Sequence, residues 1–361
     1  MTRTSRTPTR VRGMAELIAV LPYQLGYTPS RSLVLVMLRR RPGDGGPPAG
    51  DMGLTARIDL PPPEHEQAVA DHLVGVLHRQ RPHLVQLIAY EDEGDDATAL
   101  MQAIQEHCRA LSILVDTQAR VCGGRWRRVV EPDGDRPRWR PVPEAADVPA
   151  VADLVLQGAS PGGGREELAQ RLDSGSELTH QAVRLAVREA LTSGVGRTSG
   201  ASSDQGSDAA EVWGQVLRSG QGARTVADLS AGELAELVLS LQDVAVRDAL
   251  MAWLTPGQYS VSAHPPAVMS SLVRALPMSR VRAPLLVDRL LELAARIPPE
   301  LCTPVLTVLA ILAWWHGNGT LANIAIERAL RLDPDYRLAV LIDQVLAQLV
   351  PPPPLPWRKA S

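Results

Sequence analysis

The chain has 361 residues, 45% of them hydrophobic, which is enough for two domains with packed cores. Its formal net charge of −3 and its short basic stretches give no overall positive field that would favour nucleic-acid binding. Three cysteines without CxxC spacing exclude a disulfide framework and a structural zinc site, and they favour a reducing, cytoplasmic environment.

Strands and helices alternate in the first part of the chain. The run SLVLVML at 32–38 is continuously apolar, as expected of a strand buried on both faces, whereas LTARIDL at 54–60 alternates with period two. This alternation predicts an α/β domain with a mixed, partly parallel sheet and flanking helices. The expected elements are helices at 15–25, 64–81 and 97–111, and strands at 32–38, 54–60, 84–90 and 112–122, followed by an irregular excursion or hairpin at 123–149.

Beyond residue 149 every periodic segment is helical, which predicts an all-α domain of stacked helical hairpins. The expected domains are a disordered tail at 1–13, the α/β domain at 14–149, the helical domain at 150–350 with a flexible loop at 194–207, and a Pro-rich tail at 351–361. The helices are expected at 151–158, 166–172, 176–193, 209–219, 231–241, 244–254, 266–276, 284–297, 303–316, 321–332 and 336–349.

Common catalytic signatures are missing from the sequence. It has no GK[ST] Walker loop, no G-x-S-x-G elbow and no H-E-x-x-H pair, so the catalytic residues are unknown and neither a metal site nor a cofactor is predicted. The most apolar stretch, 301–315, is shorter than the roughly 20 residues that cross a bilayer, so no membrane span is expected.

One strand carries polar side chains that suggest a ligand pocket. Period two places Thr55, Arg57 and Asp59 on one face of the strand at 54–60. These residues either form a solvated edge strand with an Arg–Asp pair or line a pocket, which Tyr90-Glu91 at the end of another strand could join. Open α/β sheets usually bind ligands at strand ends.

A second charged group, Arg247 and Asp248, interrupts an otherwise apolar helical segment. Asp243 and Arg247 are four residues apart, which is typical of a helix-surface ion pair. The alternative is a charged latch between the two domains, in which Arg247 would add to the pocket of the α/β domain.

The segment Trp314-Trp315-His316-Gly317 is expected to end a helix, with Gly317 in the left-handed conformation that caps it. Adjacent helical side chains point about 100° apart, so one tryptophan can be in the core while the other faces a groove, or both can be in the core. Together with Tyr336 these residues are the candidate interaction surface.

Two resemblances follow from these stretches. The end of the chain is similar to one tetratricopeptide-type repeat, at positions Ala310, Gly317, Ala322, Ile326, Ala329 and Pro334. The whole chain resembles the DUF 4192 family, a domain of unknown function found in high-GC actinobacteria. The matching stretches are LIAVLPYQLGYTPSRSLVLV, GLTARIDLPPP, VAVRDALMAWL, AWWHGNGTLANIAIERALRLDPDYRLAVLIDQVL and the closing Pro-Trp-Arg. This resemblance implies no activity.

Two functions are compatible with these observations. The first is a non-enzymatic interaction or regulatory protein in the cytoplasm that binds a protein partner through its helical domain. The second is a hydrolase or transferase that acts on a small anionic or nucleotide-like ligand, in a pocket at the domain junction built from Arg57, Asp59, Tyr90 and Arg247.

Overall fold

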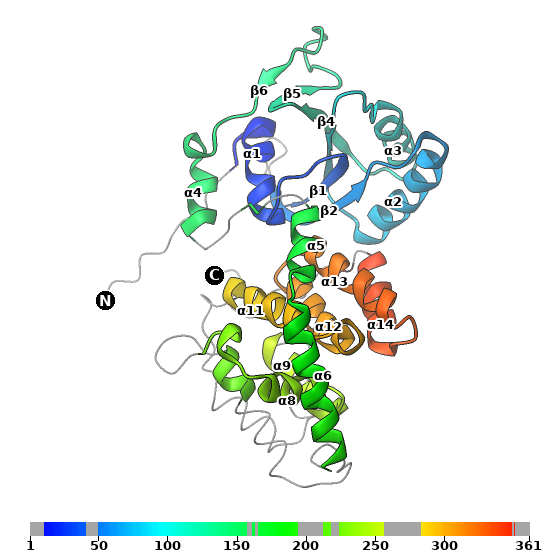
Figure 1. The fold of residues 1–361 in the computed structure, drawn as a ribbon. Helices are drawn as coiled ribbons and strands as arrows, with labels where there is room; N and C mark the ends of the chain where they lie inside the picture. Colours follow the sequence, from blue (N-terminus) through cyan, green and yellow to red (C-terminus); the bar gives the residue numbers. More distant parts are fainter. Residues whose placement is uncertain are drawn as a thin grey trace, which may run out of the picture. The chain divides into compact units, whose positions relative to one another are not determined.

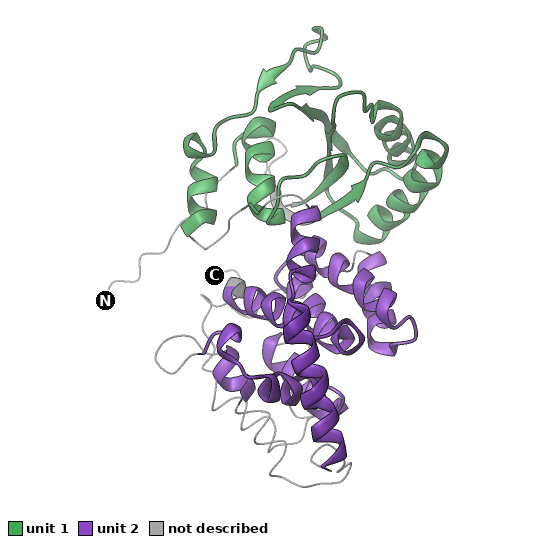
Figure 2. Ribbon diagram, viewed as in Figure 1, with its two compact units in different colours: residues 1–164 green, residues 165–361 purple. Residues whose placement is uncertain are grey.

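The structure is a computed structural model that describes residues 11–40, 50–156, 161–162, 165–193, 212–217, 224–255, 283–348 and 350. The chain forms two compact units, residues 1–164 and residues 165–361 (Figure 2). The expected loop at 194–207, the expected helix at 266–276, the tail at 351–361 and most of the tail at 1–13 lie outside the described residues.

The N-terminal unit is built on a six-stranded mixed sheet of order β2-β1-β3-β4-β5-β6 (Figure 1). β1 runs antiparallel to both β2 and β3, whereas β3 and β4 are parallel. The predicted mixed, partly parallel sheet is therefore confirmed. The strands are β1 (Ser32–Arg40), β2 (Gly50–Asp59), β3 (Leu84–Tyr90), β4 (Val115–Cys122), β5 (Arg125–Arg128) and β6 (Arg140–Pro141).

Helices cover both faces of this sheet (Figure 1). On one face lies α1 (Gly13–Leu25), because the Tyr90 hydroxyl on β3 reaches the carbonyl of Ile18 in α1. On the other face lies α3 (Thr98–Ala110), whose Met101 carbonyl accepts a hydrogen bond from Gln118 of β4. The helix α2 (Glu66–Gln80), which follows the short 3₁₀ turn η1 (Pro63–His65), packs beside α3. With helices on both faces, the apolar run of β1 is buried from Leu33 to Met37, as its composition predicts.

The helix α4 (Pro149–Leu156) belongs to the N-terminal unit, so the two units divide after Gly164 and not near residue 149. Apolar residues of α4 pack against Ala19 and Val20 on α1, on the side of α1 away from the sheet. The preceding segment contains the hairpin of β5 and β6 and the short 3₁₀ turn η2 (Ala145–Asp147). The excursion after residue 123 therefore returns to the sheet.

Two strands begin at other residues than expected. β2 begins at Gly50, four residues before the expected start at 54, because the ladder with β1 continues to the pair Arg40–Gly50. β4 begins only at Val115, because α3 ends with Ser112 in the left-handed conformation (φ +58°) and the turn occupies the residues in between.

The described part of the C-terminal unit is all-α, as predicted. Its central helix is α12 (Pro299–Trp315), which is buried along almost its whole length and contacts α8, α9, α11, α13 and α14. The helices are α5 (Arg165–Asp173), α6 (Glu177–Thr192), α8 (Ala231–Ser240), α9 (Val244–Leu254), α11 (Ala283–Arg296), α13 (Gly319–Leu332) and α14 (Arg337–Ala347), with a further helical segment at 212–217 and the 3₁₀ turn η3 (Val226–Asp228). Within the described part of the chain, no helix combines the length and apolarity needed to cross a membrane.

Candidate functional site

The candidate pocket residues Arg57 and Asp59 lie at one corner of the sheet. β2 is an edge strand, and Asp59 lies opposite Ser32, the first residue of β1. Ser32 in turn lies opposite Tyr90, the last residue of β3. The corner is therefore on the side of the sheet where the parallel strands β3 and β4 end, which is where open α/β sheets usually bind ligands.

Arg57 and Asp59 form an ion pair of 2.5 Å between Nη2 and Oδ1. The two side chains differ sharply in exposure: the Arg57 side chain is 10% exposed, whereas that of Asp59 is 61% exposed. The guanidinium therefore points into the protein and the carboxylate reaches solvent. Nη2 also lies 3.5 Å from the carbonyl oxygen of Ser30, but the buried Nε of Arg57 has no hydrogen-bond partner.

Tyr90 is buried beneath α1. Its hydroxyl donates to the carbonyl of Ile18 at 3.4 Å. Burial, assisted by the nearby Tyr27, raises the pKa of Tyr90 well above its usual value, so the phenol stays protonated at neutral pH. Tyr90 therefore supports the packing of α1 on the sheet and has no role as a base near neutral pH.

A buried ion pair between Glu91 and Arg120 organises the ends of β3 and β4. Arg120 Nε donates to Glu91 Oε2 at 2.7 Å, with side-chain exposures of 11% and 2%. The other carboxylate oxygen accepts from the Ala97 backbone N–H at 2.9 Å, and Arg120 also donates to the hydroxyl of Thr98 and the carbonyl oxygen of Asp95. The pair thus fixes the loop that leads into α3, and its hydrogen bonds leave little of Arg120 available for a ligand.

The sequence pointed to Glu91 but not to Arg120. Arg120 lies within the alternating strand β4, and on the sequence alone it is one of many arginines. Its role depends on the parallel register of β3 and β4, which places Arg120 beside Ala89, two residues before Glu91.

Arg247 and Asp248 lie in the other unit, on α9. Arg247 does not pair with Asp243, because Asp243 caps the start of α9 by accepting a hydrogen bond from the N–H of Ala245 at 2.7 Å. Instead, Arg247 donates to Asp248 Oδ1 at 2.8 Å and to the hydroxyl of Tyr336 at 3.2 Å. This bridge ties α9 to the start of α14 within the helical unit.

Trp314 and Trp315 end the central helix α12 and both are buried, at 9% and 3% exposure. The indole N–H of Trp314 donates to the carbonyl of Val350 at 2.9 Å. Gly317 has the predicted left-handed conformation (φ +85°), and the N–H of Asn318 donates to the carbonyl oxygen of Ala313 at 2.8 Å. Both tryptophans therefore pack inside the helical hairpin.

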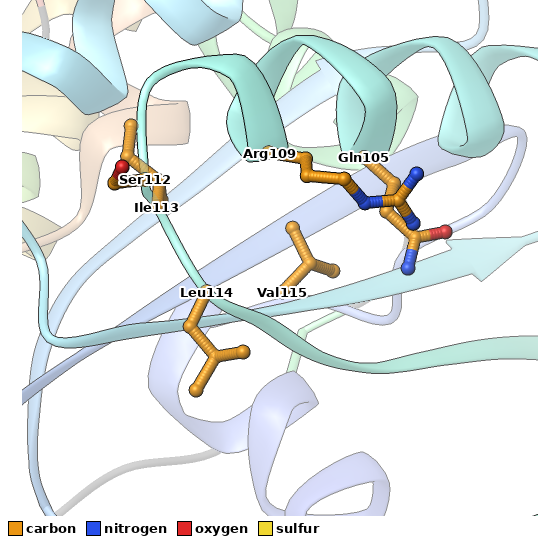
Figure 3. Close-up of a pocket in the computed structure, with 6 residues that line it drawn as sticks. All are labelled: Gln105, Arg109, Ser112, Ile113, Leu114 and Val115. Carbon is orange, nitrogen blue, oxygen red and sulfur yellow. The ribbon is translucent and has the colours of Figure 1, made fainter.

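A hollow of about 350 Å³ lies at the opposite end of β4 (Figure 3). The side chains of Gln105 and Arg109, on α3, extend side by side above Val115, while Leu114 points away from them (Figure 3). Ser112 and Ile113 complete the lining. Chemically the hollow offers one guanidinium, one amide and an apolar floor, and it is lined by none of the residues predicted from the sequence.

The comparison with known families covers nearly the whole chain. The model of the domain of unknown function DUF4192 matches residues 15–353. The chain belongs to the DUF4192 family. The resemblance of the whole chain to this family is thus confirmed. No curated protein and no solved structure matches the chain.

This DUF4192 protein gathers charged side chains at the ends of its sheet strands. The described residues contain no group of three or more His, Cys, Asp and Glu side chains that could hold a metal ion. At the sheet corner the acidic and basic groups Asp59, Arg57, Glu91 and Arg120 are combined in ion pairs. Two buried polar atoms at this corner, Arg57 Nε and Ser32 Oγ, have no hydrogen-bond partner.

Proposed function

We propose that this chain is a non-enzymatic interaction protein of the cytoplasm, which binds a protein partner through its helical unit. The observation that carries the proposal is an exposed apolar stripe on α6. We call Leu178, Ala182 and Leu185 the α6 leucine stripe. They are spaced four and three residues apart, so they lie along one side of the helix.

The stripe is exposed in the described part of the unit. Leu178 is 78% exposed and Leu185 is 54% exposed, whereas Val183 and Val187 on the other side of α6 are buried. α6 packs against α8, and it also binds the end of α11 through His180, which lies 2.9 Å from the carbonyl oxygen of Ala295. The stripe is therefore spare apolar surface on a helix that is already anchored.

Such a surface suits an amphipathic helix of a partner protein. Neighbouring leucines on a helix provide anchors for a second helix with the same i, i+4, i+7 spacing. Gln181, Arg188 and Glu189, which flank the stripe, are exposed and can form a polar rim. The buried tryptophans at the end of α12 do not offer a comparable surface.

The test replaces both leucines of the stripe by glutamate, as Leu178→Glu/Leu185→Glu. Quantitative affinity capture from native cell extract, followed by chemical crosslinking and mass spectrometry, should identify a protein retained by the wild type and crosslinked near α6. We expect the double variant to retain at least tenfold less of it, because two charges would have to be buried in the contact.

A matched control carries the same change elsewhere in the helical unit. Leu332 and Leu341 are also exposed, at 37% and 50%, so Leu332→Glu/Leu341→Glu should retain the partner at the wild-type level. Both double variants should unfold within about 1 kcal/mol of the wild type, because surface substitutions usually have small effects. Equal retention by the stripe variant and the wild type would refute the proposal.

A further inference from the structure

Three irregular features meet at the sheet corner formed by Arg31, Ser32, Arg57 and Asp59. Arg31 has a φ of +39°, which side-chain-bearing residues rarely adopt. The hydroxyl of Ser32 is buried with no hydrogen-bond partner, and so is Nε of Arg57. We propose that Ser32 and Arg57 form a binding site for an oxyanion, the phosphate or carboxylate group of a small ligand.

The register of the strands places the two donors close together. Ser32 lies opposite Asp59, and Val34 lies opposite Arg57, so Ser32 and Arg57 are diagonal neighbours on the same face of the sheet. Both are on the face that also carries Tyr90, because Ser32 lies opposite Tyr90 on its other side. Diagonal neighbours are within reach of a long side chain such as arginine, so one anion can contact both residues.

Burial makes these unused donors unusual. Ser32 is 0% exposed and the Arg57 side chain is 10% exposed, and buried polar groups in proteins nearly always have a partner. Within the guanidinium, Nη2 contacts Asp59 and the carbonyl oxygen of Ser30, whereas Nε has no hydrogen-bond partner. Two buried donors without an acceptor fit a ligand that brings acceptor oxygens.

The donor types determine the class of ligand. A guanidinium binds carboxylate and phosphate groups through paired N–H donors, and a hydroxyl adds a third donor. A cation is excluded from this position by the charge of Arg57. The side chains of Arg31 and Asp59, which flank the two buried donors, are 68% and 61% exposed, so the corner lies next to solvent.

The strained residue beside the site supports the same inference. Arg31 lies in the loop before β1, where its carbonyl accepts from the N–H of Leu60 at 2.9 Å and its guanidinium pairs with Asp95 at 3.4 Å. These contacts hold the loop against the end of β2 and against the segment between β3 and α3. Strained backbone conformations persist where surrounding contacts enforce them, and they are enriched at ligand sites.

The experiment titrates the full chain with sodium phosphate, and in a second arm with sodium acetate, at ionic strength matched with sodium chloride. The Arg Nε–Hε signal of Arg57 in ¹⁵N-correlated NMR spectra reports directly on the proposed contact. We expect a saturable shift of this signal and a saturable rise in the thermal midpoint. The anion that saturates at the lower concentration identifies the ligand group.

Two variants and one control complete the test. Arg57→Gln should abolish the saturable rise in midpoint, and Ser32→Ala should weaken binding by about tenfold, the effect of losing one charge-assisted hydrogen bond. Arg331→Gln, which removes an exposed guanidinium in the helical unit, should bind like the wild type. Because phosphate also stabilises proteins non-specifically, an equal rise in Arg57→Gln and in the control would overturn the proposal.

The remaining outcomes are also decisive. No saturable shift of the Arg57 signal with either anion would overturn the site. Should Arg57→Gln fail to fold, Ser32→Ala decides, because it removes only an unpartnered hydroxyl and is expected to fold; wild-type affinity in Ser32→Ala would then refute the site. These results do not depend on the α6 contact, so either proposal can fail alone.

Discussion

Among the described glycines of the helical unit, Gly175 is predicted to be the one that least tolerates a side chain. It lies in the turn between α5 and α6, and its φ is outside the left-handed region. The constraint is space. A Cβ at this position would lie inside van der Waals distance of the carbonyl oxygen of Ala295, at the end of α11, and 2.5 Å from Nε2 of His180.

Gly175→Ala should therefore force the turn away from α11. Moving it breaks or lengthens the hydrogen bond between His180 and Ala295, which is now 2.9 Å long. Overpacking a tight site costs about 1–3 kcal/mol, and loss of a hydrogen bond costs about 1 kcal/mol. We expect a loss of about 3 kcal/mol, which corresponds to a fall in Tm of roughly 6–12 °C for a domain of this size.

The assay is thermal and urea unfolding followed by circular dichroism, with hydrogen exchange to locate the change. Protection should fall first in the amides at the start of α6 and the end of α11. Gly319→Ala is the matched control, because a Cβ there meets no heavy atom within 4 Å. A loss below about 1 kcal/mol in Gly175→Ala would refute the reasoning, since overpacking and hydrogen-bond loss together exceed that value.

Three further predictions concern backbone conformation and pH. Gly317→Ala meets no heavy atom within 4 Å, so it should cost only the strain of the left-handed conformation, about 1–2 kcal/mol by urea unfolding. Ser112→Gly should raise stability by about 1 kcal/mol, because Ser112 holds the same conformation at the end of α3 with φ of +58°. The hydrogen bond from Arg224, aided by Ser230, lowers the pKa of Glu233 to about 2. Since this pKa is below its unfolded value, the stabilisation is present above about pH 5 and is lost as the pH falls towards 2. Unfolding midpoints measured over this range should decline less in Glu233→Gln than in the wild type.

The parts of the fold that follow from local patterns were predictable. The run at 32–38 is apolar on both sides, and a strand with helices on both faces has that composition. The order of the strands was not predictable, because pairing β1 between β2 and β3 depends on contacts between distant segments. The unit to which α4 belongs was not predictable for the same reason. An apolar helix can pack on either unit, and the contact of α4 with Ala19 and Val20 on α1 appears only in the folded chain.

The candidate site shows the same limit. The i, i+2 spacing of Arg57 and Asp59 placed both on one face of a strand, and they do form an ion pair. The exposure of the two groups could not be read from period two, because it depends on what covers the face. The sequence alone did not indicate Ser32, because a serine at the start of an apolar strand is expected at a strand boundary. Its position diagonal to Arg57 follows only from the strand register.

One face of α6 packs against the rest of the unit, whereas the other face is exposed. Its attachment to the rest of the unit rests on Val183 and Val187, together with the ion pair of 2.6 Å between Arg184 and Glu300 of α12. Exposed ion pairs contribute little, so the buried valines supply most of the stabilisation. Because the side chains of Leu178 and Leu185 are exposed, a polar residue with good helix propensity would stabilise the helix about as well at either position. The two leucines aligned on the solvent side of this anchored helix are the apolar surface that the proposed partner would bury.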